Sequence, residues 1–154
     1  MNNYNEKQNI LNQEIRKQRE QAQAQFFAAR NALQDEFQKA GAMYDDHKKE
    51  LQAELDELLA ERLILKRDGL TITNEKYAHN LQREKEINSQ QYNAKMAFFD
   101  VRRTYGKQLE TATEQYRAEK SRIDDYKAER LLQIERERAE LKERANEPEL
   151  LCGI

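Results

Sequence analysis

The chain has 154 residues, of which 36% are charged, and it contains four glycines, one proline and no tryptophan. Its mean hydropathy of −1.14 and its shortage of turn residues are wrong for a compact globular domain with a core of normal size. The formal net charge of −2 argues against nucleic acid or an acidic membrane surface as the main partner.

The segment 1–67 is predicted to form one long helix, beginning near Asn5 and ending at about Arg67. Its apolar residues recur at steps of three and four, with a mean period of about 3.6 residues, which is typical of one buried helix face. Such a helix would be on the order of 90 Å long. The positions of this first seam are Tyr4, Gln8, Leu11, Ile15, Gln18, Ala22, Phe26, Ala29, Leu33, Phe37, Ala40, Tyr44, His47, Leu51, Leu55, Leu58, Arg62 and Leu65.

Residues 68–73 are the only strong turn signal between two long helical stretches. Asp68 and Gly69 tolerate the positive φ that ends a helix. Thr71 and Thr73 are both candidate N-caps for the helix that follows. The chain is therefore expected to fold back on itself here.

Residues 69–77, Gly-Leu-Thr-Ile-Thr-Asn-Glu-Lys-Tyr, resemble the Gly-x-Ile-Thr-x-Glu-x-Tyr/Phe turn of the short helical hairpins called SHOCT segments. Those segments are found in bacterial oligomerising proteins. The resemblance covers only this turn, and it implies a hairpin without implying a function.

The segment 74–146 is predicted to be the second long helix. Its apolar stripe is thin between Gln82 and Gln91, where Ile87 is the only large apolar residue. The positions of this second seam are Tyr77, Leu81, Ile87, Ala94, Phe98, Val101, Tyr105, Leu109, Ala112, Tyr116, Ile123, Tyr126, Leu131, Ile134, Leu141 and Ala145.

The predicted fold is all-α: a long, coiled-coil-like antiparallel helical hairpin with helices of about 60 and 70 residues. Folding back at residue 70 sets Phe98 opposite residues 42–43 and Tyr105 opposite residues 34–37. Each buried aromatic contributes roughly 1.5–3 kcal/mol, so stability is expected to concentrate where the phenylalanines gather. All five are expected in the middle third of the hairpin: Phe26, Phe27, Phe37, Phe98 and Phe99.

Gly41 and Gly106 interrupt otherwise helical sequence, and each costs about 1 kcal/mol relative to alanine. Two interpretations stay open. Each glycine marks a hinge or a close approach between helices, or each is a tolerated surface residue. A helix that stopped at Gly41 would replace the long hairpin by several shorter helices.

Residues 147–154 are predicted to be a short apolar C-terminal tail, because Pro148 should end the second helix and hold Glu147 extended. The tail is either a hook that docks on a neighbouring subunit or a frayed end. Its lone Cys152 excludes an internal disulfide.

Apolar residues away from the two seams predict a surface for partner chains, because a two-helix hairpin can bury only one face of each helix. The spacing of Tyr92, Met96 and Phe99 gives this surface a stripe of its own. The alternative is that the helices are rotated and these residues form the core. The predicted contact residues are Phe27, Met43, Leu59, Leu63, Tyr92, Met96, Phe99 and Leu132, with Leu150, Leu151 and Ile154 of the tail.

No catalytic, cofactor-binding or metal-binding motif occurs in the sequence. His47 and His79 lack a second ligand at metal spacing, and there is no phosphate-binding glycine loop or nucleophile–base pair. We therefore expect no enzyme, no cofactor and no small-molecule substrate. With no signal peptide and no apolar run long enough to span a bilayer, we expect a cytoplasmic protein or one packaged into a virion.

Two function classes remain. Runs such as residues 21–25 (Gln-Ala-Gln-Ala-Gln) and 90–96 (Gln-Gln-Tyr-Asn-Ala-Lys-Met) resemble, in composition, the helices of bacteriophage virion-internal, ejection and scaffolding proteins. That resemblance implies a structural subunit that assembles with copies of itself and with other assembly proteins. The alternative is an adaptor, since a long antiparallel hairpin looks like the stalk proteins of secretion and export ATPases.

Overall fold

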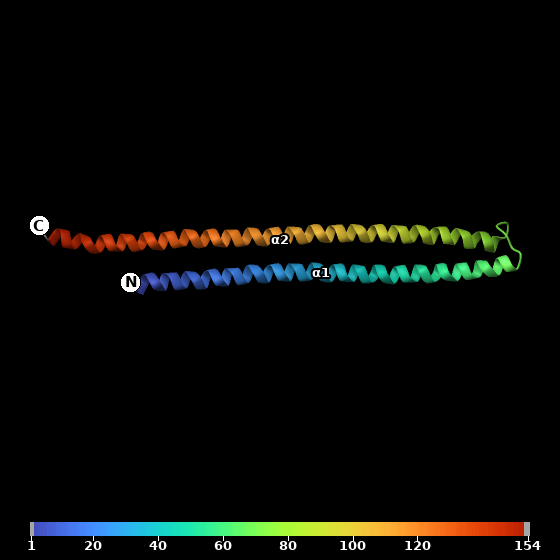
Figure 1. Ribbon diagram of the computed structural model, residues 1–154, viewed down its shortest axis with the longest axis horizontal. Helices are drawn as coiled ribbons and strands as arrows, with labels where there is room; N and C mark the ends of the chain where they lie inside the picture. The colour runs from blue at the N-terminus through green and yellow to red at the C-terminus, as the bar shows by residue number, and fades with distance from the viewer. Residues whose placement is uncertain (1, 153–154) are drawn as a thin grey trace. The chain divides into compact units, whose positions relative to one another are not determined.

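The computed structural model describes the backbone of residues 2–152 and the side chains of residues 3–145. Over these residues it contains two helices, α1 at Asn2–Arg67 and α2 at Glu75–Cys152, and no strand. The helices run in opposite directions and pack against each other as a hairpin (Figure 1). The predicted all-α helical hairpin is confirmed.

The end of α1 is a Schellman motif, and it falls at Arg67 as predicted. Gly69 adopts a φ of 78°, the left-handed conformation that a residue with a Cβ rarely takes. The Gly69 N–H donates to the Lys66 carbonyl, and the Leu70 N–H donates to the Leu65 carbonyl, both at 3.0 Å. These two bonds satisfy carbonyls that the end of the helix would leave unpaired.

The start of α2 is capped by Asn74 rather than by either threonine. The Lys76 N–H donates to Asn74 Oδ1 at 2.9 Å, which is the bond that an N-cap side chain accepts. The hydroxyls of Thr71 and Thr73 instead bond to each other at 2.9 Å. Both predicted caps are therefore wrong.

The far end of α2 also differs from the prediction. The helix continues through Pro148 to Cys152, so the prediction that Pro148 ends it and that Glu147 is extended is wrong. A proline removes a single N–H from the helical ladder. Here that loss does not stop the last helical turns from forming.

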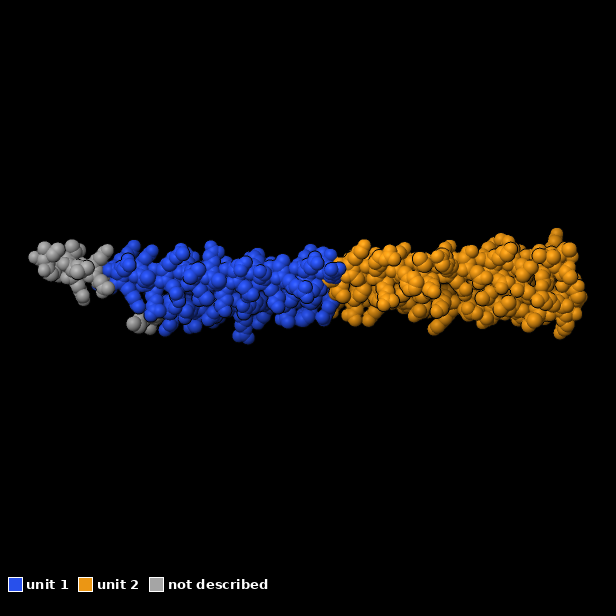
Figure 2. All heavy atoms as spheres, turned by 45° about the horizontal axis from the view of Figure 1, so that its top comes forward, with its two compact units in different colours: residues 1–30, 110–154 blue, residues 31–109 orange. Residues whose placement is uncertain are grey.

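Contacts divide the chain into two compact units, each made from part of α1 and part of α2. Unit 1 comprises residues 1–30 and 110–154, and unit 2 comprises residues 31–109 (Figure 2).

Unit 1 has an aliphatic core. Ile15 and Ile123, from opposite helices, are 2% and 0% exposed. Phe26 and Tyr116 stack beside them, with ring centroids 4.8 Å apart. The buried cluster consists of Leu11, Ile15, Ala22, Ile123 and Ile134.

Unit 2 combines buried aliphatic residues with a ladder of stacked rings. Leu51, Leu65 and Ile87 are buried. The Phe98 ring stacks on Tyr44 with centroids 4.7 Å apart, and the Phe37 ring stacks on Tyr105 at 4.6 Å. These pairs match the predicted antiparallel register to within a few residues.

Burial follows the two predicted seams closely. Every first-seam position except Ala29 and His47 is buried or half-buried, and so is every second-seam position except Val101, Leu141 and Ala145. The alternative in which the helices are rotated is thereby excluded.

The phenylalanines, around which stability is expected to concentrate, are not the most deeply buried residues. Phe27 and Phe99 are 39% and 42% exposed, and the other three are only half-buried. Each of these two exposed residues directly follows a seam phenylalanine, so it points about 100° away around the helix. The most deeply buried apolar side chains of the described residues are aliphatic.

Neither Gly41 nor Gly106 breaks its helix. A Cβ added to Gly41 would lie 3.8 Å from the Phe98 ring, which is ordinary van der Waals contact, and one added to Gly106 would meet nothing within 4 Å. A helix end at Gly41 is excluded, and no close approach requires glycine at either position.

Candidate partner-binding surface

The eight predicted contact residues with described side chains are all exposed, by 39% to 74%. They are Phe27, Met43, Leu59, Leu63, Tyr92, Met96, Phe99 and Leu132. The other three, Leu150, Leu151 and Ile154, lie outside the residues whose side chains are described. Six of the eight belong to unit 2, so among the residues with described side chains most of this apolar set lies in that unit.

A shallow groove of about 400 Å³ runs along unit 2 between the two helices. Tyr92, which is 63% exposed, forms part of its wall, and Lys48 and Lys95 lie on opposite helices. The groove is lined by Tyr44, Lys48, Leu51, Gln52, Asn88, Gln91, Tyr92, Ala94 and Lys95. It therefore offers an aromatic ring, amides and two cations to a partner.

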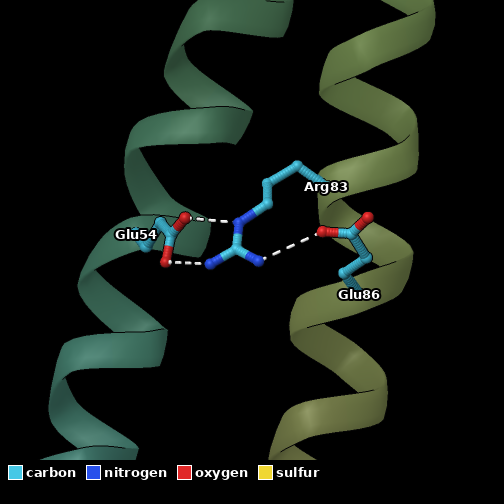
Figure 3. Close-up of polar contacts among 3 residues, drawn as sticks. All are labelled: Glu54, Arg83 and Glu86. Atoms are coloured by element: carbon cyan, nitrogen blue, oxygen red, sulfur yellow. Dashed lines mark hydrogen bonds and ion pairs between the residues drawn. The ribbon is translucent and has the colours of Figure 1, made fainter.

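An arginine clamp joins the helices of unit 2 elsewhere. Arg83 of α2 donates two hydrogen bonds to the carboxylate of Glu54 in α1, at 2.5 and 2.8 Å, and a third to Glu86 at 3.2 Å (Figure 3). The bonds from Arg83 lower the pKa of Glu54, and those from Glu54 and Glu86 raise the pKa of Arg83. The clamp thus holds two carboxylates around one guanidinium.

The groove and the clamp lie on opposite edges of the contact between the helices. Gln52 lines the groove and Glu54 accepts from Arg83. Two residues along a helix correspond to a turn of about 200°. Leu51, buried against α2, marks the contact line, so Gln52 and Glu54 flank it on opposite sides. We call these the groove edge and the clamp edge of unit 2.

A buried polar cluster crosses unit 2 near the turn. Asn80 is 2% exposed; its Nδ2 donates to the Leu58 carbonyl at 2.8 Å, and its Oδ1 accepts from Arg62 Nε at 3.0 Å. Arg62 also pairs with Glu84. Asn80 is therefore satisfied on both sides of its amide, as a buried polar group must be.

Unit 1 presents a different apolar surface at its open end, where α2 extends beyond the start of α1 (Figure 1). Leu141 is 57% exposed there although it belongs to the seam. Arg138 lies over the Tyr4 ring, 4.3 Å from its centroid. Lys7 pairs with Glu137 at 2.7 Å and thereby lowers the pKa of that carboxyl.

Within residues 3–145, no group of three or more histidine, cysteine or acidic side chains is arranged to hold a metal ion. His47 and His79 are both exposed. Across the described part of the chain, no helix is long and apolar enough to cross a membrane.

Arg62 was a predicted seam position. The burial of Asn80 and the groove were not predicted. The signal for Asn80 was the thin apolar stripe that follows it. Where a seam lacks large apolar residues, a polar side chain next to it can turn inward if the opposite helix satisfies it. The groove forms where facing side chains of the two helices leave space between them. The periodicity of one helix does not show where that space lies.

Comparison of the chain with models of known protein families, with curated proteins and with solved structures finds no match.

Proposed function

We propose that this chain is a non-enzymatic structural subunit of a large homo-oligomeric assembly, of the kind found inside bacteriophage virions or among their scaffolding proteins. In such an assembly, copies pack side by side and cover apolar surface that one hairpin leaves open. The proposal is supported by glutamine- and alanine-rich runs, such as residues 21–25, that resemble in composition the helices of virion-internal and scaffolding proteins.

The observation that carries this proposal is the exposure of the predicted contact residues. Tyr92, Met96 and Phe99 are spaced to form one stripe on α2, and each is at least 42% exposed. Soluble monomers rarely leave large contiguous apolar patches open, and such patches mark partner surfaces. A second copy of the same chain is the simplest partner.

The alternative, an adaptor or stalk protein of an export ATPase, is favoured by the helical hairpin alone. The two proposals differ in copy number. A structural subunit assembles with many copies of itself, whereas an adaptor inserts as a single copy into a ring made of another protein.

The deciding experiment is light scattering of the purified chain across a tenfold dilution. We expect a mass several times the 18.4 kDa of one chain, and a fall in mass on dilution. A cooperative melt together with a mass of 18.4 kDa at every concentration would remove the assembly proposal and leave the adaptor as the better interpretation.

A further inference from the structure

The groove of unit 2 is lined by two lysines and by no acidic residue. On the groove edge, Lys48 and Lys95 are exposed. Neither lysine takes part in any of the ion pairs among the described residues of unit 2. Lys95 lies 5.7 Å from the centroid of the exposed Phe99 ring, so this edge combines positive charge with aromatic surface.

The clamp edge carries an acidic stripe on α1. Glu50, Glu57 and Glu61 are in line with Glu54 of the clamp, because steps of four, three and four residues keep side chains on one helix face. Of these four, Glu54 is held by Arg83. The others are exposed and lie outside the ion pairs of unit 2.

The same stripe also carries an apolar residue. Met43, seven residues before Glu50, shares this face and is 74% exposed. A thioether is well suited to pack against aromatic rings. The clamp edge therefore offers both an anionic and an apolar group, and the groove edge offers a cationic and an aromatic group.

We propose that the acidic stripe on α1 of one copy docks in the unit 2 groove of a second copy. Glu57 and Glu61 would face Lys48 and Lys95. Complementary charge fixes partner choice and register at an interface more than it adds affinity. The inference rests on the proposed function, to which it adds the identity of the contacting surfaces.

The location of the two surfaces sets the type of assembly. Because the groove and the stripe lie on opposite edges of unit 2, each copy uses one edge for one neighbour and the other edge for the next. Such a head-to-tail contact generates a closed ring or an open filament rather than an isolated dimer.

Charge reversal on either side tests this contact. The variant Lys48→Glu with Lys95→Glu makes the groove acidic, and the variant Glu57→Lys with Glu61→Lys makes the stripe basic. Each should bring the mass down to the 18.4 kDa of one chain, since like charges then meet. A chain that carries all four substitutions restores opposite charges at the contact and should regain the wild-type mass.

The matched control for the lysine variant is Lys17→Glu with Lys142→Glu, which changes the net charge by the same amount on exposed residues of unit 1. Its mass should stay that of the wild type, and circular dichroism should show equal helix content in all variants.

If the two-residue variants keep the wild-type mass, the inference fails, the proposed function stands, and the groove is open to an acidic helix of another protein. If the four-residue variant remains a monomer with full helix content, the two surfaces are not partners. A monomeric wild-type chain would overturn both the inference and the proposed function.

Discussion

Among single residues, the three described glycines occupy two different backbone settings. Gly41 and Gly106 have helical neighbours on both sides, and neither site is too crowded for a methyl group. Gly69 has a positive φ and open space around it. The same substitution should therefore have opposite effects at these positions.

We expect Gly41→Ala and Gly106→Ala each to stabilise the fold by about 1 kcal/mol, because alanine loses less backbone entropy in a helix. Gly69→Ala should destabilise it by about 1–2 kcal/mol, the cost of placing a Cβ in the left-handed region. Urea midpoints followed by circular dichroism at one fixed protein concentration measure all three. A loss of stability in Gly41→Ala would mean that the Phe98 ring cannot accept the added methyl group.

Sequence alone could not identify which side chain caps α2. Thr71, Thr73 and Asn74 all have side chains able to cap a helix. Which of them becomes the N-cap depends on the path of the backbone after the Schellman motif. That motif directs the backbone so that Asn74 accepts from Lys76. Local propensity predicted that a cap exists here, and the backbone geometry of the turn determines that the capping residue is Asn74.

At the scale of the helices, the seams were predictable because a period of 3.6 residues identifies the buried face. Leu11, Ile15 and Leu51, all predicted seam positions, are buried. The Asn80–Arg62–Glu84 cluster was not predictable, because a buried polar group depends on partners from the other helix. The clamp of Arg83 on Glu54 is likewise a property of the pair of helices.

The polar cluster gives a prediction for the pairing of α1 with α2. Asn80→Leu should destabilise the fold by about 1–3 kcal/mol, because the Leu58 carbonyl and the Arg62 guanidinium each lose a buried partner. Replacing all three members, with Asn80→Leu, Arg62→Met and Glu84→Leu, should be nearly neutral or stabilising, since no charge or amide then stays buried.

Urea unfolding of the single and triple variants checks this pairing effect. A triple variant less stable than Asn80→Leu alone would contradict it, and would mean that the three polar groups stabilise the fold beyond satisfying one another. Arg16→Met with Glu20→Leu is the matched control, because that pair is exposed on α1 alone. Its removal should change stability by less than about 0.5 kcal/mol.

At the scale of the whole chain, carboxylates in both units are held in their charged form. Arg83 lowers the pKa of Glu54 in unit 2, while Arg122 and Lys7 lower those of Glu119 and Glu137 in unit 1. In each case the leading cause is a hydrogen bond from the cation. Protonation of these carboxylates at low pH should therefore destabilise both units.

The sign of the pH effect follows from these shifts. A carboxyl whose pKa is lower in the folded chain than in the unfolded chain stabilises the fold above its unfolded pKa, about 4.3 for glutamate. That contribution is lost as the pH falls through the lower, folded value. Stability should thus be level from neutral pH down to about 5 and should decline below it.

The decline should be shallower in the variant with Glu54→Gln, Glu119→Gln and Glu137→Gln, because glutamine keeps an acceptor oxygen without titrating. Thermal melts of both chains from pH 7 to pH 2, at one protein concentration and one ionic strength, give the comparison. The control is Glu6→Gln with Glu129→Gln, at exposed positions, which should follow the wild-type curve. If the three-residue variant loses stability in acid as steeply as the wild type, the ion pairs of Glu54, Glu119 and Glu137 do not set the acid response, and the remaining carboxylates of the chain do.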